Sequence, residues 1–258
     1  MGGASGAIGT GRVFRAPPDG YTLGAGNWGT HVANGAIYAL PYDVVSDFEP
    51  VVLHQIFYYV LAAKKALPAG NLKELIAWLK ANPDRASFGT TGVGSQGHLA
   101  GILFQKLTGT TFQHVPYRGA GPAIQDLIAG QIDLVFGDPS VVPAVRAGSV
   151  KAIAVTAKSR LPAVSDIPTA EESGLAGFSF ANWVGIFAPK STPKEIIGKL
   201  NGAIGSTLAD PNIRQRLVDL GVEIPSPDQQ TPGAFAALQK VEIEKWWPII
   251  KAAGIKGE

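Results

Sequence analysis

The chain has 258 residues, 46% of them apolar, and a formal net charge of +2. That length suffices for one large or two small globular domains with buried cores. Lysine and arginine are scattered along the chain, which argues against a nucleic-acid-binding stripe. The chain has no cysteine, so disulfides, thiolate catalysis and zinc–cysteine sites are excluded. The longest apolar run, Phe57–Ala63, is too short to span a membrane. No charged and then apolar leader precedes Gly2, so no secretion signal is expected.

Strands and helices are predicted to alternate along the chain. A Gly-rich turn leads into Ile8–Phe14, a pattern typical of the middle of a βα unit, so an earlier part of that unit is expected to be missing. Strands are predicted at Tyr21–Ala25, Asp47–Ala63, Thr111–Pro116, Ile132–Phe136, Lys151–Thr156 and Ser179–Ala188, the last broken by Gly185. Helices are predicted at Asn71–Ala81, Gly119–Ala129, Thr192–Leu208, Asn212–Leu220 and Thr231–Ala253, and a loop at Gly26–His31 precedes a short helix to Tyr38. This alternation indicates parallel βαβ units and the α/β class.

The stretch Ser87–Phe104 has the pattern of a strand, a Gly-rich turn and a helix. Such a turn leaves unpaired backbone N–H groups at a helix N-terminus, where the helix dipole adds about half a positive charge. The sequence therefore predicts an anion site at this turn. We expect the N–H groups from Thr91 to Ser95, and the Ser95 hydroxyl, to bind a carboxylate. A tight turn without a ligand is the alternative.

The segment Gly92–Gly97 also fits the dinucleotide-binding pattern G-x-G-x-x-G. That pattern expects an acidic residue about 20 positions further on, which would bind the ribose. No carboxylate lies between His98 and Asp126, although Arg118 could contact a 2′-phosphate. An NADP-linked oxidoreductase is therefore the alternative hypothesis, and a carboxylate site is favoured.

Several motifs together resemble a known family, the Bug-type substrate-binding proteins of tripartite tricarboxylate transporters. The resemblance extends in order from about Gly3 to Lys256. Its motifs are Ala16–Leu23 (APPDGYTL), Leu40–Asp43 (LPYD) with Asp47-Phe48, Gly92-x-Gly94-Ser95-x-x-His98-Leu99, His114–Gly119 (HVPYRG), Leu127-x-x-Gly130-Gln131-x-Asp133, Val184-x-Ile186–Pro189 (IFAP) and Ala253–Lys256 (AGIK).

The resemblance implies a periplasmic, non-enzymatic receptor without a cofactor. It implies a type II periplasmic-binding-protein-like α/β fold of two doubly wound domains joined by two crossing strands, with a small di- or tricarboxylate or aromatic acid in the cleft. Domain 1 is expected to comprise residues 1–61 and 180–258, and domain 2 residues 62–179. Hinge closure would bury the ligand for the membrane subunits of the transporter, or for a sensor kinase. No nucleic-acid partner is implied, and the receptor is expected to be a monomer.

The sequence departs from the family pattern at its beginning. In the family, an N-terminal βαβ unit has a Gly-rich turn that supplies backbone donors to the ligand. This unit is expected to be absent here, which would remove half of the expected hydrogen bonds to the carboxylate. A start codon assigned too far downstream would explain this. A remnant that folds but no longer binds is therefore a third hypothesis. Asn34-Gly35 replaces the family's Asn-Pro, and Arg118 replaces its usual lysine.

Further ligand contacts are expected at the ends of strands. The loop after the first strand would line one side of the ligand cleft with Asn27, Trp28, Thr30 and His31. Trp28 could instead belong to the hydrophobic core. The expected contacts on the other side are Thr91, Gly92, Val93, Gly94, Ser95, His98 and Asp138. His98 could equally bond a neighbouring backbone carbonyl, and Asp138 could equally form the turn before Pro139.

Catalysis has little support in the sequence. The four histidines are isolated, and neither H-E-x-x-H nor G-x-S-x-G occurs. Nothing in the spacing pairs a nucleophile with a base, and Ser95-x-x-His98 is not a triad. The sequence therefore predicts neither an enzyme nor a metal site.

Overall fold

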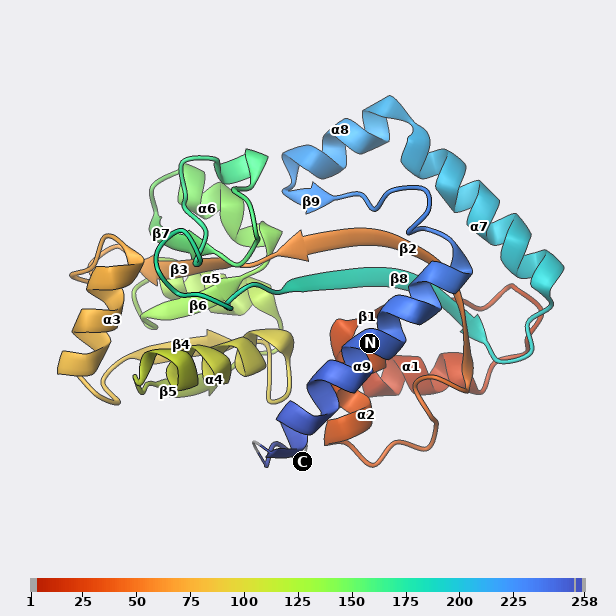
Figure 1. The fold of residues 1–258 in the computed structure, drawn as a ribbon, viewed down its shortest axis with the longest axis horizontal. Helices are drawn as coiled ribbons and strands as arrows, with labels where there is room; N and C mark the ends of the chain where they lie inside the picture. The colour runs from red at the N-terminus through yellow and green to blue at the C-terminus, as the bar shows by residue number, and fades with distance from the viewer. Residues whose placement is uncertain (1–3, 253, 257–258) are drawn as a thin grey trace. The chain divides into compact units, whose positions relative to one another are not determined.

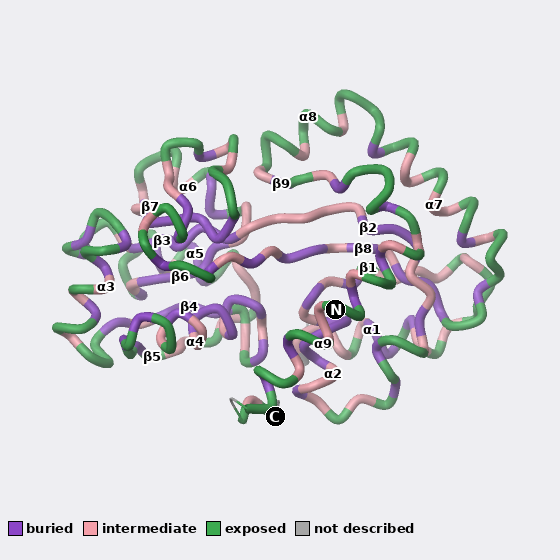
Figure 2. Tube along the Cα trace, in the orientation of Figure 1, coloured by how far each residue is buried: buried purple, intermediate pink, exposed green. Residues whose placement is uncertain are grey.

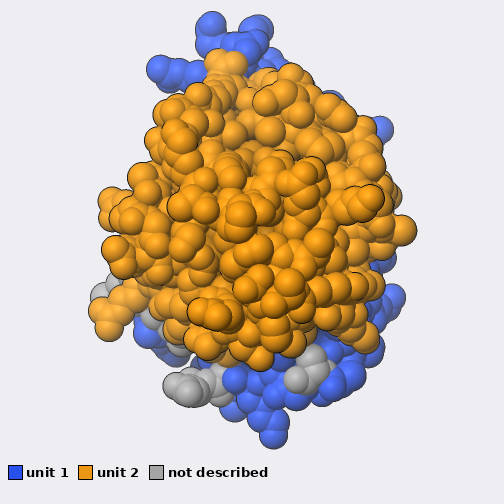
Figure 3. All heavy atoms as spheres, turned by 90° about the vertical axis from the view of Figure 1, so that its left-hand side faces the viewer, with its two compact units in different colours: residues 1–56, 182–217, 223–258 blue, residues 57–181, 218–222 orange. Residues whose placement is uncertain are grey.

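The computed structural model describes residues 4–252 and 254–256. The chain divides into two compact units (Figures 1 and 3). Unit 1 consists of residues 1–56, 182–217 and 223–258, and unit 2 of residues 57–181 and 218–222. Each unit contains its own sheet, and we describe the two separately.

Unit 2 is built on a five-stranded sheet with the strand order β5-β4-β6-β3-β7. Its strands are β3 (Val60–Lys64), β4 (Ser87–Thr90), β5 (Gln113–Pro116), β6 (Leu134–Gly137) and β7 (Val150–Val155). β4 pairs in parallel with β5 and β6, as helical crossovers require. The expected parallel arrangement fails for β3, which runs antiparallel to both β6 and β7. β3 enters this sheet directly from β2 of the other sheet, and its direction is set by its pairing with β6 and β7, which a local sequence pattern does not reveal.

Helices cover both faces of this sheet. They are α3 (Leu72–Ala81), α4 (Gln96–Thr108), α5 (Ala120–Ile128) and α6 (Val142–Arg146). Leu61 of β3 belongs to the core cluster that contains Leu75 of α3 and Phe104 of α4. Its neighbour Val60 belongs to the opposite cluster, with Leu127 of α5. The alternation along β3 is that of a strand buried on both faces.

Unit 1 contains most of a four-stranded sheet with the order β1-β8-β2-β9. The strands are β1 (Gly24–Asn27), β2 (Phe48–Tyr58), β8 (Ala181–Pro189) and β9 (Val222–Glu223). β1 runs antiparallel to β8 and lies at the edge of the sheet. β2 and β8 are the strands along which the chain passes from one unit to the other.

Helices also pack on both faces of the sheet of unit 1. The helices of this unit are α1 (Ala7–Phe14), α2 (Asn34–Ile37), α7 (Lys194–Ala209), most of α8 (Pro211–Asp219) and α9 (Pro232–Ala252). Ile197 of α7 packs with Ala188 of β8 on one face. On the other face, Phe235 of α9 lies 4.8 Å from Phe187 of β8, ring centre to ring centre. The predicted α/β class is therefore confirmed.

Some predicted elements lie elsewhere in the structure. The strand expected at Tyr21–Ala25 is found at Gly24–Asn27, and a helical segment, Gly29–Ala33, begins within the expected loop. β8 continues through Gly185 without a break. The helix predicted for Thr231–Ala253 is α9, although Ala253 itself lies outside the described residues.

Burial follows the sheets. β3, β4 and β6 are buried over most of their length, whereas no residue of α8 is buried (Figure 2). Among the residues that the structure describes, no helix combines the length and the apolar character needed to cross a membrane.

Candidate functional site

The predicted strand, glycine turn and helix over Ser87–Phe104 are confirmed as β4, a turn and α4. The turn follows the carboxyl end of a parallel strand, where ligands of open α/β sheets bind. Gly92 has a φ of 117° and Gly94 a φ of 76°, values that favour glycine. Ser95 is the N-cap of α4, and its hydroxyl accepts the amide of His98 at 3.3 Å.

Only part of the turn's backbone is available to a ligand. The Gly94 amide donates to Nδ1 of His98 at 3.2 Å, and the Ser95 amide donates to the carbonyl of Gly92 at 3.1 Å. The expectation that both amides face a ligand is corrected, because the turn itself uses them. Within the described part of the chain, the amides of Thr91 and Gly92 have no acceptor. The exposed Thr91 and the half-buried Gly92 and Ser95 thus offer two amides and a hydroxyl proton.

His98 forms a hydrogen bond with the backbone of the turn. Its Nδ1 accepts the Gly94 amide, so the neutral ring carries its proton on Nε2. Burial lowers the pKa of His98 below its ordinary value of 6.5. The ring packs edge-on against His114 at 4.7 Å, and burial, with repulsion from His98, lowers the pKa of His114 to about 4. His98 was expected to contact the ligand or to bond a backbone carbonyl; its observed backbone partner is instead the amide of Gly94.

Gln96 links the beginning of α4 to the strands at the edge of unit 2. Its side chain is 5% exposed; Nε2 donates to the carbonyl of Ala181 at 2.6 Å, and Oε1 accepts the Tyr59 hydroxyl at 3.2 Å. The Tyr59 amide in turn donates to the hydroxyl of Thr156, which donates to the carbonyl of Phe180, both at 2.9 Å. Gln96 was not predicted as a functional residue, because a glutamine in a G-x-G-S-x-x-H motif carries no chemical signal of its own.

The two other polar residues near this edge have separate roles. Asp138 follows β6 and accepts the amide of Ser140 at 2.9 Å, as well as its hydroxyl. The turn-forming alternative therefore matches the contacts of Asp138. Arg118 follows β5 and is exposed, without a partner in the part of the chain that the structure describes.

The residues predicted for the opposite lip belong to unit 1 and divide into two groups. Trp28 is completely buried; its indole donates to Glu242 at 2.8 Å and packs edge-on against Trp246. The core alternative therefore matches Trp28. Asn27 and Thr30 bond each other: the Asn27 amide donates to the Thr30 hydroxyl at 2.9 Å, and the Thr30 amide donates to Oδ1 of Asn27 at 3.0 Å.

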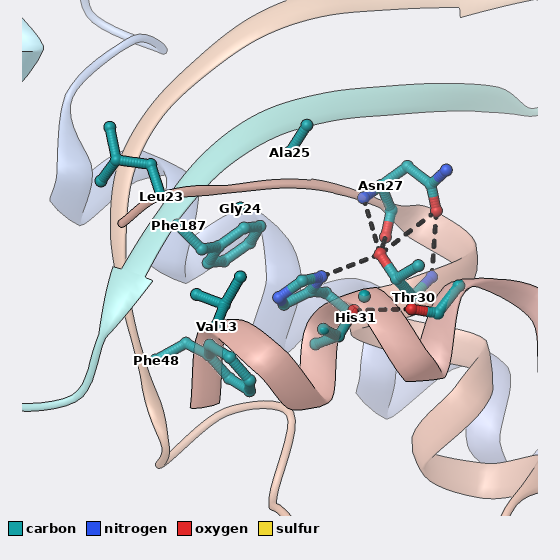
Figure 4. A pocket seen from close by; sticks show the side chains of 12 residues that line it. Val13, Leu23, Gly24, Ala25, Asn27, Thr30, His31, Phe48 and Phe187 are labelled. Carbon is teal, nitrogen blue, oxygen red and sulfur yellow. Dashed lines mark hydrogen bonds between the residues drawn. The ribbon is translucent and has the colours of Figure 1, made fainter. Parts of the chain in front are cut away.

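A pocket of about 380 Å³ lies within unit 1 and brings together Asn27, Thr30 and His31 (Figure 4). Its walls come from α1, β1 and the helical segment Gly29–Ala33, and from Phe48 and Phe187. His31 is 2% exposed, and burial lowers its pKa to about 3, so the ring is neutral at pH 7. The ring stacks on Phe187 at a centroid distance of 3.8 Å.

Neither region has the donors of a metal centre. No group of three or more histidine, aspartate or glutamate side chains capable of holding a metal ion occurs in residues 4–252 and 254–256. The arrangement can offer hydrogen-bond donors to an anion at the turn of unit 2, and a pocket without charged side chains in unit 1.

Comparison with known proteins identifies the family. The model of the tripartite tricarboxylate transporter family receptor matches residues 1–255. Many solved structures are similar to this chain, and three of those that match nearly all of it are described here. MatC from Rhodopseudomonas palustris, solved with bound malate, is 38% identical, with a TM-score of 0.90 over 96% of this chain and 85% of MatC. The periplasmic binding protein BugD is 35% identical, with a TM-score of 0.92 over 100% of this chain and 86% of BugD.

A second R. palustris protein, solved with adipate, is 33% identical, with a TM-score of 0.92 over 98% of this chain and 85% of that protein. These similarities agree with the motifs found in the sequence, and the predicted resemblance is confirmed. The chain belongs to the tripartite tricarboxylate transporter receptor family.

Proposed function

We propose that this chain is a periplasmic receptor that binds a small dicarboxylate at the turn between β4 and α4 and delivers it to the membrane subunits of a tripartite transporter. The observation that carries the proposal is the pair of unpartnered amides of Thr91 and Gly92, within the described residues, beside the hydroxyl of Ser95, the N-cap of α4. A carboxylate accepts bonds from all three donors and lies at the positive end of the helix dipole.

The similar proteins support this choice of ligand class. MatC holds malate and the second R. palustris protein holds adipate, and both ligands are dicarboxylates. BugD supports the periplasmic location. Nothing at the turn favours the NADP-linked alternative, because Gly94 and Ser95 already use the amides that a pyrophosphate would need. We expect a monomeric receptor that closes about a hinge when it binds, with no catalytic step.

The proposal is tested by titrating the purified protein with malate and adipate and following heat release and thermal unfolding. A ligand at one hundred times its Kd stabilises the folded state by about 2.7 kcal/mol, which raises Tm by about 5 to 10 °C. NADPH, tested in the same way, should leave Tm unchanged. If no di- or tricarboxylate released heat or raised Tm, the result would favour the hypothesis of a remnant that folds but no longer binds. Saturable NADPH binding would favour the oxidoreductase.

A pair of glycine variants tests the location of the site. Gly92→Ala places a side chain where φ is 117°, and no atom lies within 4 Å of the new Cβ, so the change distorts the turn without a packing clash. Gly109→Ala is the matched control, since Gly109 ends the same helix with a φ of 63° and equally open surroundings. We expect Gly92→Ala to weaken dicarboxylate binding at least tenfold, whereas Gly109→Ala binds as the wild type does. If the two variants bound the dicarboxylate with equal affinity, the turn between β4 and α4 would not be part of the binding site.

A further inference from the structure

The beginning of α4 has the two hydrogen bonds of a capping box, with a histidine in the place of the usual glutamate or glutamine. The Ser95 hydroxyl accepts the amide of His98 at 3.3 Å, and Nδ1 of His98 reaches back to accept the amide of Gly94 at 3.2 Å. The second bond goes to the residue before the N-cap, while the Ser95 amide donates to the carbonyl of Gly92. The Ser95-x-x-His98 motif is therefore a helix cap.

The same pair of bonds begins α3, with a carboxylate in place of the imidazole. Oδ1 of Asn71 accepts the amide of Glu74 at 2.9 Å, and Oε2 of Glu74 accepts the amide of Gly70 at 2.7 Å. A turn that begins at Thr169 is closed by Glu172, which accepts the Thr169 amide at 2.8 Å and donates its own amide to the Thr169 hydroxyl at 2.9 Å. These two caps carry a negative charge, which is favourable at a helix N-terminus.

The cap of α4 is uncharged. Nδ1 of His98 accepts from a backbone amide, which can only donate, so the ring carries its proton on Nε2. Burial lowers the pKa of His98, which keeps the ring uncharged at pH 7. The adjacent His114 is uncharged too: its Nε2 accepts from Nε2 of Gln105 at 2.9 Å, because Oε1 of that side chain accepts the Phe112 amide. Neither ring brings a charge to the turn.

A charged cap at this position would conflict with a bound anion. The amides of Thr91 and Gly92, which have no acceptor among the described residues, belong to the same turn as the Gly94 amide that His98 holds. A carboxylate at position 98 would repel a carboxylate bound to these amides. The imidazole makes the same hydrogen bond without a charge, so the donors of the turn stay available to an anion.

We propose that His98 is a positioning residue of the dicarboxylate site, which closes the cap of α4 through Nδ1 without adding a charge and so keeps the turn between β4 and α4 open to an anion. This inference rests on the proposed function. The imidazole acts through the backbone of Gly94, and the role requires no contact between the ring and the ligand.

Replacing His98 with glutamine and with glutamate separates the hydrogen bond of the cap from its charge. Both side chains can accept the Gly94 amide, as Glu74 accepts that of Gly70, and only glutamate is negative. By calorimetry at pH 7, His98→Gln should bind malate within about threefold of the wild type, and His98→Glu about tenfold more weakly than His98→Gln. Glu74→Gln makes the same exchange at the cap of α3 and should leave malate affinity unchanged. Equal malate affinities of His98→Gln and His98→Glu would overturn the proposal.

Stability and salt dependence give readouts that a purely structural role of His98 does not predict. His98→Glu should have a Tm no lower than that of His98→Gln, because a carboxylate is favourable in the first turn of a helix, so its loss of binding is not a loss of folding. Raising the salt concentration to about 1 M, where the Debye length is about 3 Å, should reduce the difference in malate affinity between the two variants. A difference that salt leaves unchanged would overturn the role assigned to charge.

His98→Leu tests the hydrogen bond itself. Leucine accepts no hydrogen bond, so Tm should fall and malate should bind about tenfold more weakly, and both properties should recover in His98→Gln. Unchanged malate binding in His98→Leu would overturn the positioning role. If the wild type bound neither malate nor adipate, the proposed function would be refuted and this inference with it, whereas wild-type binding that no His98 variant alters would refute this inference alone.

Discussion

Acid should destabilise this protein through its buried histidines, and the largest lowering of a histidine pKa is that of His31. Its pKa falls from 6.5 to about 3 on folding because burial penalises the charged ring. The unfolded chain therefore binds a proton that the folded chain does not bind. Stability from the neutral His31 is complete above pH 6.5 and is lost as the pH falls from 6.5 towards about 3.

The size of the effect follows from the two pKa values. Each pKa unit corresponds to about 1.4 kcal/mol. Near pH 4.5, about two units below the unfolded pKa and still above the folded one, His31 alone should remove about 3 kcal/mol. The pKa of His114, lowered to about 4, adds a smaller loss, because its ring is partly exposed and solvent weakens the effect. Together they amount to a large part of the roughly 5–15 kcal/mol by which proteins of this kind are stable.

Urea unfolding followed by tryptophan fluorescence at pH 7 and near pH 4.5 measures this loss. His31→Phe removes the titrating group, so the difference in unfolding free energy between the two pH values should shrink by about 3 kcal/mol. Val32→Ala is the control, because Val32 is completely buried and does not titrate, so this variant should lose stability equally at both pH values. Parallel pH profiles for the wild type and His31→Phe would refute the reasoning.

Three further predictions concern stability and binding. Asn71→Ala removes the side-chain cap of α3 and should cost about 1 kcal/mol in thermal unfolding; no loss would show that the cap is dispensable. Gly185→Ala should yield little folded protein, because the new Cβ would overlap the ring of Phe235, whereas Gly202→Ala, in open space on α7, should be neutral or stabilising by up to about 1 kcal/mol in the same circular-dichroism melts. Gln96→Leu should weaken malate binding about tenfold by calorimetry, since α4 loses two buried hydrogen bonds that hold its first turn; unchanged affinity would limit Gln96 to a packing role.

Elements governed by local patterns could be predicted from the sequence. The apolar spacing of Asn71–Ala81 and its asparagine cap are properties of a single segment, and the structure confirms both, with Oδ1 of Asn71 accepting the Glu74 amide at 2.9 Å. The strand, turn and helix around Ser95 were predictable for the same reason. The antiparallel direction of β3 was not, because it depends on pairing with β6 and β7 from distant parts of the chain.

Gly185 shows how one residue type can be misread without its neighbours. A glycine inside a strand suggests a break, and the sequence analysis placed one there. In the structure, β8 is continuous, and the missing side chain allows the Phe235 ring and the carbonyl of Val52, 2.7 Å from a Cβ at this position, to approach. The glycine is therefore explained by close packing, a contact between segments about 50 and 130 residues apart that no local pattern reveals.

The candidate sites share this limit, because hydrogen bonds decide which groups a ligand can use. The glycine pattern predicted an amide-rich turn, but the bond from Gly94 to His98 and the bond from Ser95 to Gly92 leave the amides of Thr91 and Gly92 as the available pair. In the same way, the polar residue types of the first loop suggested a ligand surface, whereas Asn27 and Thr30 bond each other and the ring of His31 is buried. Sequence thus locates polar groups, and the three-dimensional pairing among them decides which donors remain for an anion at the turn of unit 2.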